Sequence, residues 1–242
     1  RGLGDVYKRQ PWDSLNLGIS RGDSDENVRE NYRRFCAAVG VTAESTVFTQ
    51  QTHSENIRLV TAQDAGKGLL RPRDYTEVDA LITDTPGLSL VVFSADCGTI
   101  LLYDPVHRAI GAVHAGWRGV AAGLVAKTAL KMHDTFGTEL GDLLCALGPA
   151  IGPCCFETDD DVPAAMHDAL GAQADPFLTR RGAKWHIDLK AINAHWLKSL
   201  GVRHIDICPH CTACRQDLYW SHRKVGNARG AQIALLALED PL

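Results

Sequence analysis

Two residues that can bind a metal or act in catalysis each follow a short apolar run in the middle of the chain. The run at 88–93 consists mainly of leucine and valine, which predicts a buried strand that leads to Cys97. The runs at 100–103 and 109–113 predict two further strands joined by an Asp-Pro turn, and the second strand leads directly to His114. We therefore expect a hairpin that brings the thiol of Cys97 and the imidazole of His114 together.

A thiol and an imidazole in contact permit two kinds of chemistry. The histidine can activate the cysteine as a nucleophile, or both side chains can bind zinc. His53 follows a strand predicted at 45–48 and lies among small polar residues, so it offers a third ligand. Three protein ligands with a water in the fourth position are typical of a catalytic zinc. Packing alone is the remaining alternative, because free cysteine is among the most frequently buried residue types.

Four short motifs surround these residues. They are Gln51-Thr52-His53, Asp79-Ala80-Leu81-Ile82-Thr83, Ala95-Asp96-Cys97 and His114-Ala115-Gly116-Trp117-Arg118-Gly119. In this order they resemble the laccase-domain family, also called the polyphenol-oxidase-type purine nucleoside phosphorylases, which includes the peptidoglycan-editing factors. The resemblance extends from about Asp13 to Leu238 and implies that His53, Cys97 and His114 bind zinc and are the catalytic residues. The chain departs from the family at Gly98-Thr99, because the family often has a proline at the second position after the cysteine.

Three further positions are expected to bind substrate. Asn16 lies in a Leu-Asn-Leu-Gly segment similar to one in the family, and it either reaches the active site or satisfies a turn. Arg118 precedes a helix predicted at 120–136, where an anion site and a surface ion pair are equally compatible with the sequence. Glu157 ends a Gly-Pro loop that resembles the family's substrate loop, where it would accept a hydrogen bond from a ribose hydroxyl or a base. Its alternative role is to cap the helix that begins near Asp159.

Three residues near the C-terminus lie in motifs that are similar to the family's last conserved segment. His222 and Arg223 belong to a Trp-Ser-His-Arg sequence, and Arg229 to an Ala-Arg-Gly sequence. Two arginines and a histidine beside a zinc pocket would suit phosphate. The alternative is a set of exposed charges before the last strand, predicted at 232–238.

Several cysteines lie outside the expected zinc site. Two overlapping CxxC spacings, which are typical of metal chemistry, occur at Cys208, Cys211 and Cys214. His210 or His222 would complete a set of four ligands, although the resemblance does not require a second metal. Cys154 and Cys155 are adjacent in the chain and therefore form a poor chelating pair, so we interpret them as packing residues.

Composition excludes several classes of protein. The net charge of −4 and the absence of a basic block argue against a nucleic-acid partner. The longest apolar runs are far shorter than the roughly 18 residues of a membrane span. Eight cysteines in 242 residues do not indicate a disulfide framework, and a thiolate ligand fits the reducing cytoplasm. The expected partners are a small nucleoside and phosphate. The sequence does not predict the oligomeric state, and a monomer is compatible with it.

The first ten residues differ from the rest. The segment 1–10 has no apolar period and resembles the translation of a transposon adapter used in sequencing libraries. We expect it to be an artefact that contributes nothing to the fold. The laccase-like domain would then comprise 11–242 and lack its natural N-terminus.

The order of predicted elements indicates the fold class. Strands and helices alternate without a regular βαβ repeat, and several strands form hairpins, which argues for an α+β fold with mixed sheets. The resemblance implies a single domain whose sheets are layered between helices (α/β/β/α). Ser24 and Gly40 are expected to begin and end a core-packing helix, and Gly137 to end the helix at 120–136. The loop at 61–77 is expected to frame the site as a lid.

The resemblance implies a zinc-dependent purine nucleoside phosphorylase. Adenosine or inosine and phosphate would give the free base and ribose 1-phosphate. The family also implies methylthioadenosine phosphorolysis and adenosine deamination. The alternatives are a hydrolase that edits peptidoglycan precursors, a polyphenol oxidase with copper in place of zinc, and a non-enzymatic zinc-stabilised binding module.

Overall fold

The computed structural model describes residues 15–239. The segment expected to be an adapter artefact, 1–10, lies outside the described residues. Within them the chain forms three sheets and six α-helices. No helix in the described part of the chain is both long and apolar enough to cross a membrane.

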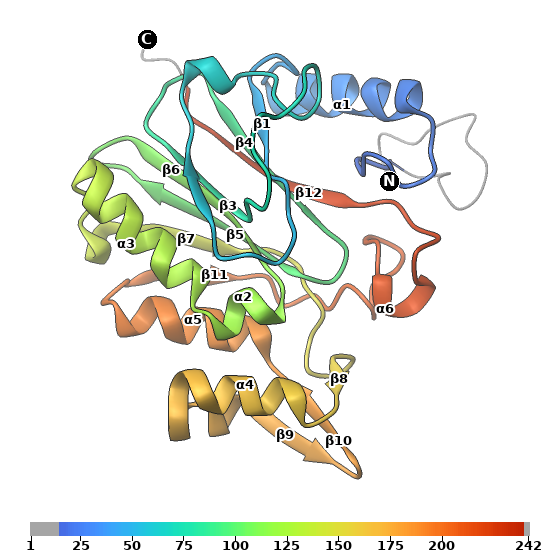
Figure 1. The fold of residues 1–242 in the computed structure, drawn as a ribbon, viewed down its shortest axis with the longest axis vertical. Helices are drawn as coiled ribbons and strands as arrows, with labels where there is room; N and C mark the ends of the chain where they lie inside the picture. The colour runs from blue at the N-terminus through green and yellow to red at the C-terminus, as the bar shows by residue number, and fades with distance from the viewer. Residues whose placement is uncertain (1–14, 240–242) are drawn as a thin grey trace.

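A six-stranded mixed sheet forms the centre of the molecule (Figure 1). Its strand order is β11-β7-β5-β6-β3-β2. From one edge to the other these strands are His204–Ile207, Leu144–Leu147, Gly98–Asp104, Ala109–Ala115, Ala80–Thr83 and Ile57–Leu59. The hairpin β5–β6 is antiparallel, whereas β11 runs parallel to β7 and β2 runs parallel to β3.

A second, three-stranded sheet packs on one face of the central sheet. Its order is β1-β4-β12, with bounds Thr46–Phe48, Ser89–Ser94 and Gln232–Ala237. Successive residues of β4 point to opposite faces, so Leu90 packs toward the central sheet and Val91 toward α1 (Asp25–Val39). Both faces of β4 are therefore buried, which explains why its sequence is a nearly continuous apolar run rather than an alternating one.

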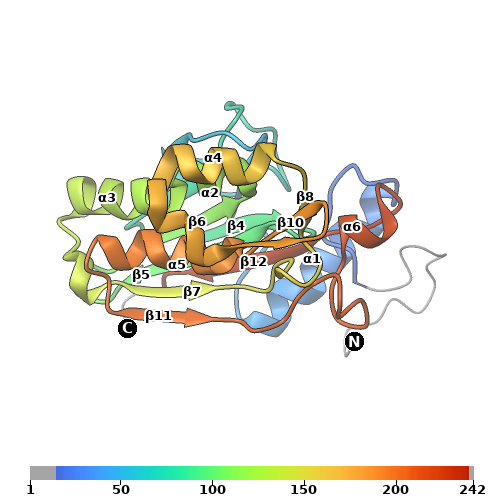
Figure 2. The ribbon, with the colours of Figure 1, turned by 90° about the horizontal axis from the view of Figure 1, so that it is seen from below.

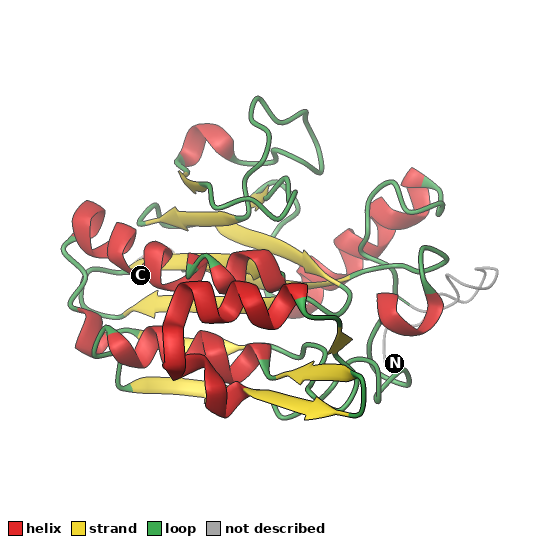
Figure 3. Cartoon of the chain, turned by 60° about the horizontal axis from the view of Figure 1, so that its bottom comes forward, coloured by secondary structure: helices red, strands yellow, loops and turns green. Residues whose placement is uncertain are grey.

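Helices cover the other face of the central sheet, as Figures 2 and 3 show. They are α2 (Trp117–Ala121), α3 (Leu124–Phe136), α4 (Asp161–Leu170) and α5 (Leu189–Ser199). With α1 on the outside of the smaller sheet, the layers are α/β/β/α, and the predicted α+β fold is confirmed. A small third sheet, in the order β8-β10-β9, lies beside α4 and projects from the body (Figure 1). Its strands are Glu157–Thr158, Lys184–Ile187 and Leu178–Arg181. The remaining elements are three 3₁₀ turns, at Ala62–Asp64, Leu140–Asp142 and Gly171–Phe177, and the short helix α6 (His222–Val225).

The helix signals were correct for α1 and partly wrong for the next helix. The Ser24 hydroxyl accepts a hydrogen bond from the backbone N–H of Asn27 at 3.2 Å, and Gly40 ends α1 with φ of 77°. The helix predicted at 120–136 is instead divided into α2 and α3, because Gly123 adopts φ of 66° between them. Gly137 ends α3 as expected.

Ion pairs within the loop at 61–77 and a hydrogen bond to β1 hold the loop in place. The ammonium of Lys67 donates to the carboxylates of Asp64 at 2.7 Å and Asp74 at 2.9 Å. Burial acts against the charge of Asp64, but hydrogen bonds from Lys67, the backbone of Thr61 and Arg58 together outweigh burial and lower the pKa of this carboxyl. Tyr75 is buried and donates its hydroxyl to the carbonyl of Phe48 at 2.6 Å. These contacts fix the part of the loop that carries Arg73.

Candidate metal centre and adjoining cavity

The hairpin β5–β6 brings the expected metal ligands together. Cys97 directly precedes β5, and His114 lies near the end of β6, opposite Thr99 in the antiparallel register. The Sγ atom of Cys97 lies 3.7 Å from Nε2 of His53. Within the described residues, one ligand atom from each of His53, Cys97 and His114 lies within 4.8 Å of the others. The predicted proximity of these three side chains is therefore confirmed.

The backbone around His53 is shaped to admit its ring. His53 itself has φ of 63°, a left-handed conformation that is uncommon for a residue other than glycine. A Cβ atom on Gly116 would lie 2.2 Å from Cδ2 of His53 and 3.3 Å from Sγ of Cys97. Only glycine leaves room for both ligands at this position, which accounts for the glycine that follows His114-Ala115.

Asp79 positions two of the three ligands. Its carboxylate is completely buried and lies 2.7 Å from Nδ1 of His114. It also accepts hydrogen bonds from the backbone N–H groups of Thr52 at 3.0 Å, His53 at 3.1 Å and Ser54 at 2.8 Å. A carboxylate on Nδ1 orients the ring and leaves Nε2 for the ion, as in carboxylate–histidine–metal arrangements. The sequence motif contained Asp79, but the expected site omitted it.

The charges of this group stabilise a thiolate at Cys97. Burial acts against a thiolate at Cys97, yet hydrogen bonds from His114 and His53 outweigh burial and lower the pKa of the thiol. Burial would lower the pKa of His114, but Asp79 and Cys97 outweigh it and raise the pKa. Asp79 keeps a lowered pKa despite burial, because His114 and backbone N–H groups stabilise its charge. Thiolate is the form that binds metal ions, so the donor set fits a metal such as zinc.

A cavity of about 300 Å³ opens beside the three ligands. His53, Cys97 and His114 form part of its wall. Three arginines, Arg21, Arg73 and Arg229, also line it. Burial and, to a smaller extent, the nearby charge of Arg21 lower the pKa of Arg229, as expected for two positive charges that face each other. An anion bound between them would relieve their repulsion.

Arg229 is the one expected substrate-binding residue that lines this cavity. Asn16 is buried instead, and its side-chain oxygen accepts hydrogen bonds from the backbone N–H groups of Gly18 at 2.8 Å and Ala231 at 3.1 Å. It satisfies the turn, which was its alternative role. Arg118 lies within α2 rather than before a helix, is exposed, and places its guanidinium 4.2 Å from the centre of the Trp117 ring.

The other three expected residues lie on a neighbouring surface. Glu157 is exposed in β8, and its backbone carbonyl accepts hydrogen bonds from the guanidinium of Arg223 at 2.9 and 3.0 Å. Neither residue lines the cavity, and Asp160 rather than Glu157 flanks the start of α4. Nδ1 of His222 accepts a hydrogen bond from Nε of Arg229 at 3.4 Å, so His222 contacts a residue of the cavity wall.

Asp96 is a second carboxylate that the sequence interpretation missed. It is buried, precedes Cys97 and has φ of 92°. Its carboxylate accepts hydrogen bonds from the hydroxyl of Thr212 and the backbone N–H of Arg223, each at 2.6 Å. Its carbonyl accepts one from Ile151 at 2.8 Å. Asp96 therefore connects three separate segments directly beneath the thiolate, and its positive φ is local strain of the kind often found at functional sites.

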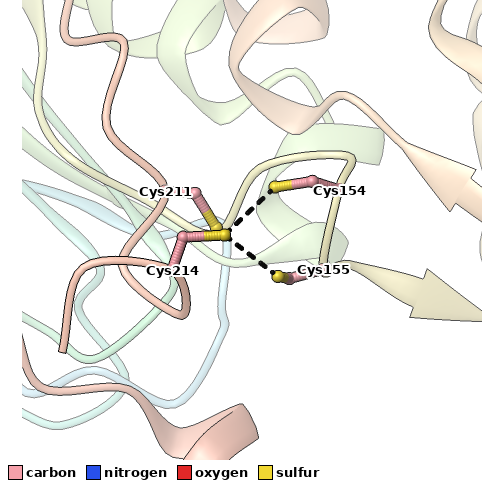
Figure 4. A group of neighbouring side chains, drawn as sticks. All are labelled: Cys154, Cys155, Cys211 and Cys214. Atoms are coloured by element: carbon pink, nitrogen blue, oxygen red, sulfur yellow. Dashed lines mark hydrogen bonds between the residues drawn. The ribbon is translucent and has the colours of Figure 1, made fainter.

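The interpretation of the remaining cysteines was incomplete. Cys155 packs against Ile151, Cys211 and Ala213, as expected. The sulfur atoms of Cys154 and Cys155 also lie 3.6 and 3.5 Å from that of Cys214 (Figure 4). Cys208 lies outside this group, and its carbonyl accepts a hydrogen bond from Lys190. Neither proposed histidine joins it, since Nδ1 of His210 contacts the hydroxyl of Tyr219 and His222 is held by Gly226.

Comparison with known proteins identifies the family. A profile of the family described as multi-copper polyphenol oxidoreductase laccase matches residues 4–239. The chain belongs to this laccase-like family. The resemblance inferred from the four motifs is therefore confirmed.

Relatives in the laccase-like family are similar over most of their length. The chain is 33% identical over 237 residues to the purine nucleoside phosphorylase YlmD of Geobacillus stearothermophilus, covering 95% of this chain and 85% of the relative. It is 32% identical to the purine nucleoside phosphorylase YfiH of Escherichia coli, covering 88% and 82%. The crystal structure of a hypothetical protein YfiH from Bacillus licheniformis superposes with a TM-score of 0.91 at 31% identity, covering 96% of this chain and 88% of that one.

Proposed function

We propose that this laccase-like protein is a zinc-dependent purine nucleoside phosphorylase. The observation that carries the proposal is a cavity whose wall combines a His-Cys-His metal centre with three arginines. The names of the relatives support the same activity. The substrates would be adenosine or inosine with phosphate, and the products the free base and ribose 1-phosphate.

His53, Cys97 and His114 would hold the ion, which supplies a Lewis acid without redox chemistry when it is bound. The arginines have a separate role, because guanidinium groups bind phosphate through charge-assisted hydrogen bonds. Arg73 is already fixed by a hydrogen bond to the carbonyl of Thr49 at 2.6 Å, so it loses little freedom when phosphate binds. Phosphate held in this way would be oriented toward the anomeric carbon of the nucleoside, and this orientation accelerates the displacement of the base.

The remaining cavity wall suits a nucleoside. Phe93 offers an apolar ring next to Ser94 and Ala95, where a purine would be shielded from water. The side chain of Gln51 holds the backbone of Phe93 in place, because its amide oxygen accepts from the N–H of Phe93 at 2.7 Å and its nitrogen donates to the carbonyl of Phe93 at 2.9 Å. We extend the proposal to methylthioadenosine phosphorolysis and adenosine deamination at the same centre, and to a cytoplasmic location that keeps Cys97 reduced.

The test is a nucleoside assay with protein of defined metal content. Adenosine and inosine are incubated with and without phosphate, with oxygen excluded, and base and ribose 1-phosphate are measured by chromatography. We expect base release that requires phosphate, and inosine without phosphate if deamination also occurs. Base release that is indifferent to phosphate would overturn the phosphorylase proposal. Oxidation of phenols in air, or cleavage of a cell-wall precursor alone, would favour the copper oxidase or the peptidoglycan-editing hydrolase instead.

A further inference from the structure

Four cysteines form a second group outside the proposed active site. They are Cys154, Cys155, Cys211 and Cys214. Their four sulfur atoms all lie within 4.8 Å of one another. Figure 4 shows the four side chains pointing toward one another from two loops that are far apart in the sequence. From this geometry we propose that the four thiolates bind a structural zinc ion.

The distances between the sulfur atoms are close to those around a single tetrahedral zinc ion. Zinc–sulfur bonds of about 2.3 Å in a tetrahedron place the sulfur atoms about 3.8 Å apart. The sulfur of Cys214 lies 3.6 Å from that of Cys154 and 3.5 Å from that of Cys155. Four thiolates without an open position are typical of a structural rather than a catalytic zinc.

The backbone supports thiolate ligands at this place. The N–H of Gly152 donates to the sulfur of Cys211 at 3.2 Å, an interaction that stabilises negative charge on sulfur. The N–H groups of Cys214 and Arg215 donate to the carbonyl of Cys211 at 3.2 and 3.0 Å, which forms the turn that presents both cysteines of the CxxC segment. The N–H of Cys155 donates to the carbonyl of Gly152 at 3.0 Å, and this turn presents the adjacent pair.

The second centre would fix the support of the first. The cysteine-bearing loops follow β7 and β11, and both contact Asp96. Ile151 donates to the carbonyl of Asp96, and Thr212 donates to its carboxylate. A zinc ion that joins these loops would therefore hold Asp96, and through it the position of Cys97. This inference does not depend on the reaction catalysed.

The experiment counts metal in the full chain and assigns it to each centre. Zinc, iron and protein are quantified in the protein as purified, and again after it has been stripped under reducing conditions, reloaded with zinc and desalted. We expect two zinc ions per chain in the wild type, and one in Cys97→Ala and in Cys214→Ser. Cys208→Ser is the matched control, because it removes a nearby thiol outside the group and should keep two. Retention of two zinc ions by Cys214→Ser, or a stoichiometric iron content, would overturn the proposal.

A second measurement applies even if Cys214→Ser fails to fold. X-ray absorption at the zinc edge of Cys97→Ala reports the ligands of the remaining ion alone. We expect a first shell of sulfur only, with bonds of about 2.3 Å. A shell that contains nitrogen, the absence of zinc from this variant, or a disulfide among the four cysteines by mass spectrometry would contradict the assignment.

Discussion

Replacing Asp79 by asparagine should weaken metal binding at the His-Cys-His centre. One carboxylate oxygen accepts from Thr52 and Ser54, and the other from His53 and His114. An amide supplies only one oxygen, so its NH₂ group must face one of these two pairs of donors. If it faces His114, Nδ1 becomes the acceptor and the proton moves to Nε2, where it blocks coordination.

The opposite orientation of the amide is no better for the site. The NH₂ group would then face the N–H groups of Thr52 and Ser54, which hold the turn that carries His53. Loss of a partner behind a metal-binding histidine typically costs about 10–100-fold in affinity. We therefore expect zinc affinity to fall about 10–100-fold, which corresponds to about 1.4–2.7 kcal/mol.

The assay is a competition titration of the zinc-free protein against a chelator of known affinity. The matched control is Asp104→Asn, because Asp104 is also buried and its carboxylate lies 2.9 Å from Nδ1 of His107, away from the centre. Asp104→Asn should lower the melting temperature and leave zinc affinity at the centre unchanged. Equal zinc affinity in wild type and Asp79→Asn would refute the role assigned to this carboxylate, and equal losses in both variants would show that the effect is one of general stability.

Three further predictions address the cavity and the adjoining loop. Gly116→Ala should abolish metal binding at the His-Cys-His centre, because the new Cβ overlaps the ring of His53. The control is Gly119→Ala, whose Cβ would lie 3.5 Å from its nearest neighbour, and zinc analysis should show that this variant retains the metal. Arg229→Ala should raise the KM for phosphate about 10–100-fold, the value of one charge-assisted hydrogen bond. Replacing the exposed Arg118 by alanine should leave this KM unchanged. Equal KM values for phosphate in Arg229→Ala and wild type would remove Arg229 from the phosphate site. The pKa of Asp64 is lowered from 3.8, so its contribution to the free energy of unfolding is present at neutral pH and lost as pH falls through and below that value. Denaturant titrations should therefore show Asp64→Asn as less stable at pH 7, by a difference that shrinks as pH falls below 3.8. A difference independent of pH would contradict this linkage.

The strands and α1 could be predicted from the sequence because their signals are local. The apolar runs and the helix caps lie within the elements they define. The break between α2 and α3 could not be predicted in this way. Gly123 adopts the left-handed conformation at the break, and Trp196 of α5 packs against it: its indole N–H donates to the carbonyl of Val120 at 2.9 Å and its ring packs on Gly123. A contact across 76 positions leaves no mark in the periodicity of either helix.

The site shows the same limit. The three candidate metal ligands could be grouped from the sequence because their types and motifs indicate metal chemistry. The arginines of the cavity could not all be found in this way. Arg21 and Arg73 lie in segments without a motif, and only the packing of their loops brings them beside Arg229. Conversely, Arg118 and Arg223 lie in motifs yet bind Trp117 and the carbonyl of Glu157.

The parallel pairing of β7 and β11 explains why the sequence interpretation did not join Cys154 and Cys155 to the CxxC segment. Leu147 pairs with Ile207 at the ends of these strands, so the chain leaves both at the same edge of the sheet. The adjacent cysteines 154 and 155 follow one strand and the CxxC segment follows the other, about 60 positions later. Each half alone is an incomplete ligand set, because zinc requires four ligands. Parallel pairing at an edge strand joins the two halves and places both beside Asp96, so the same topology that positions Cys97 also builds the proposed structural centre.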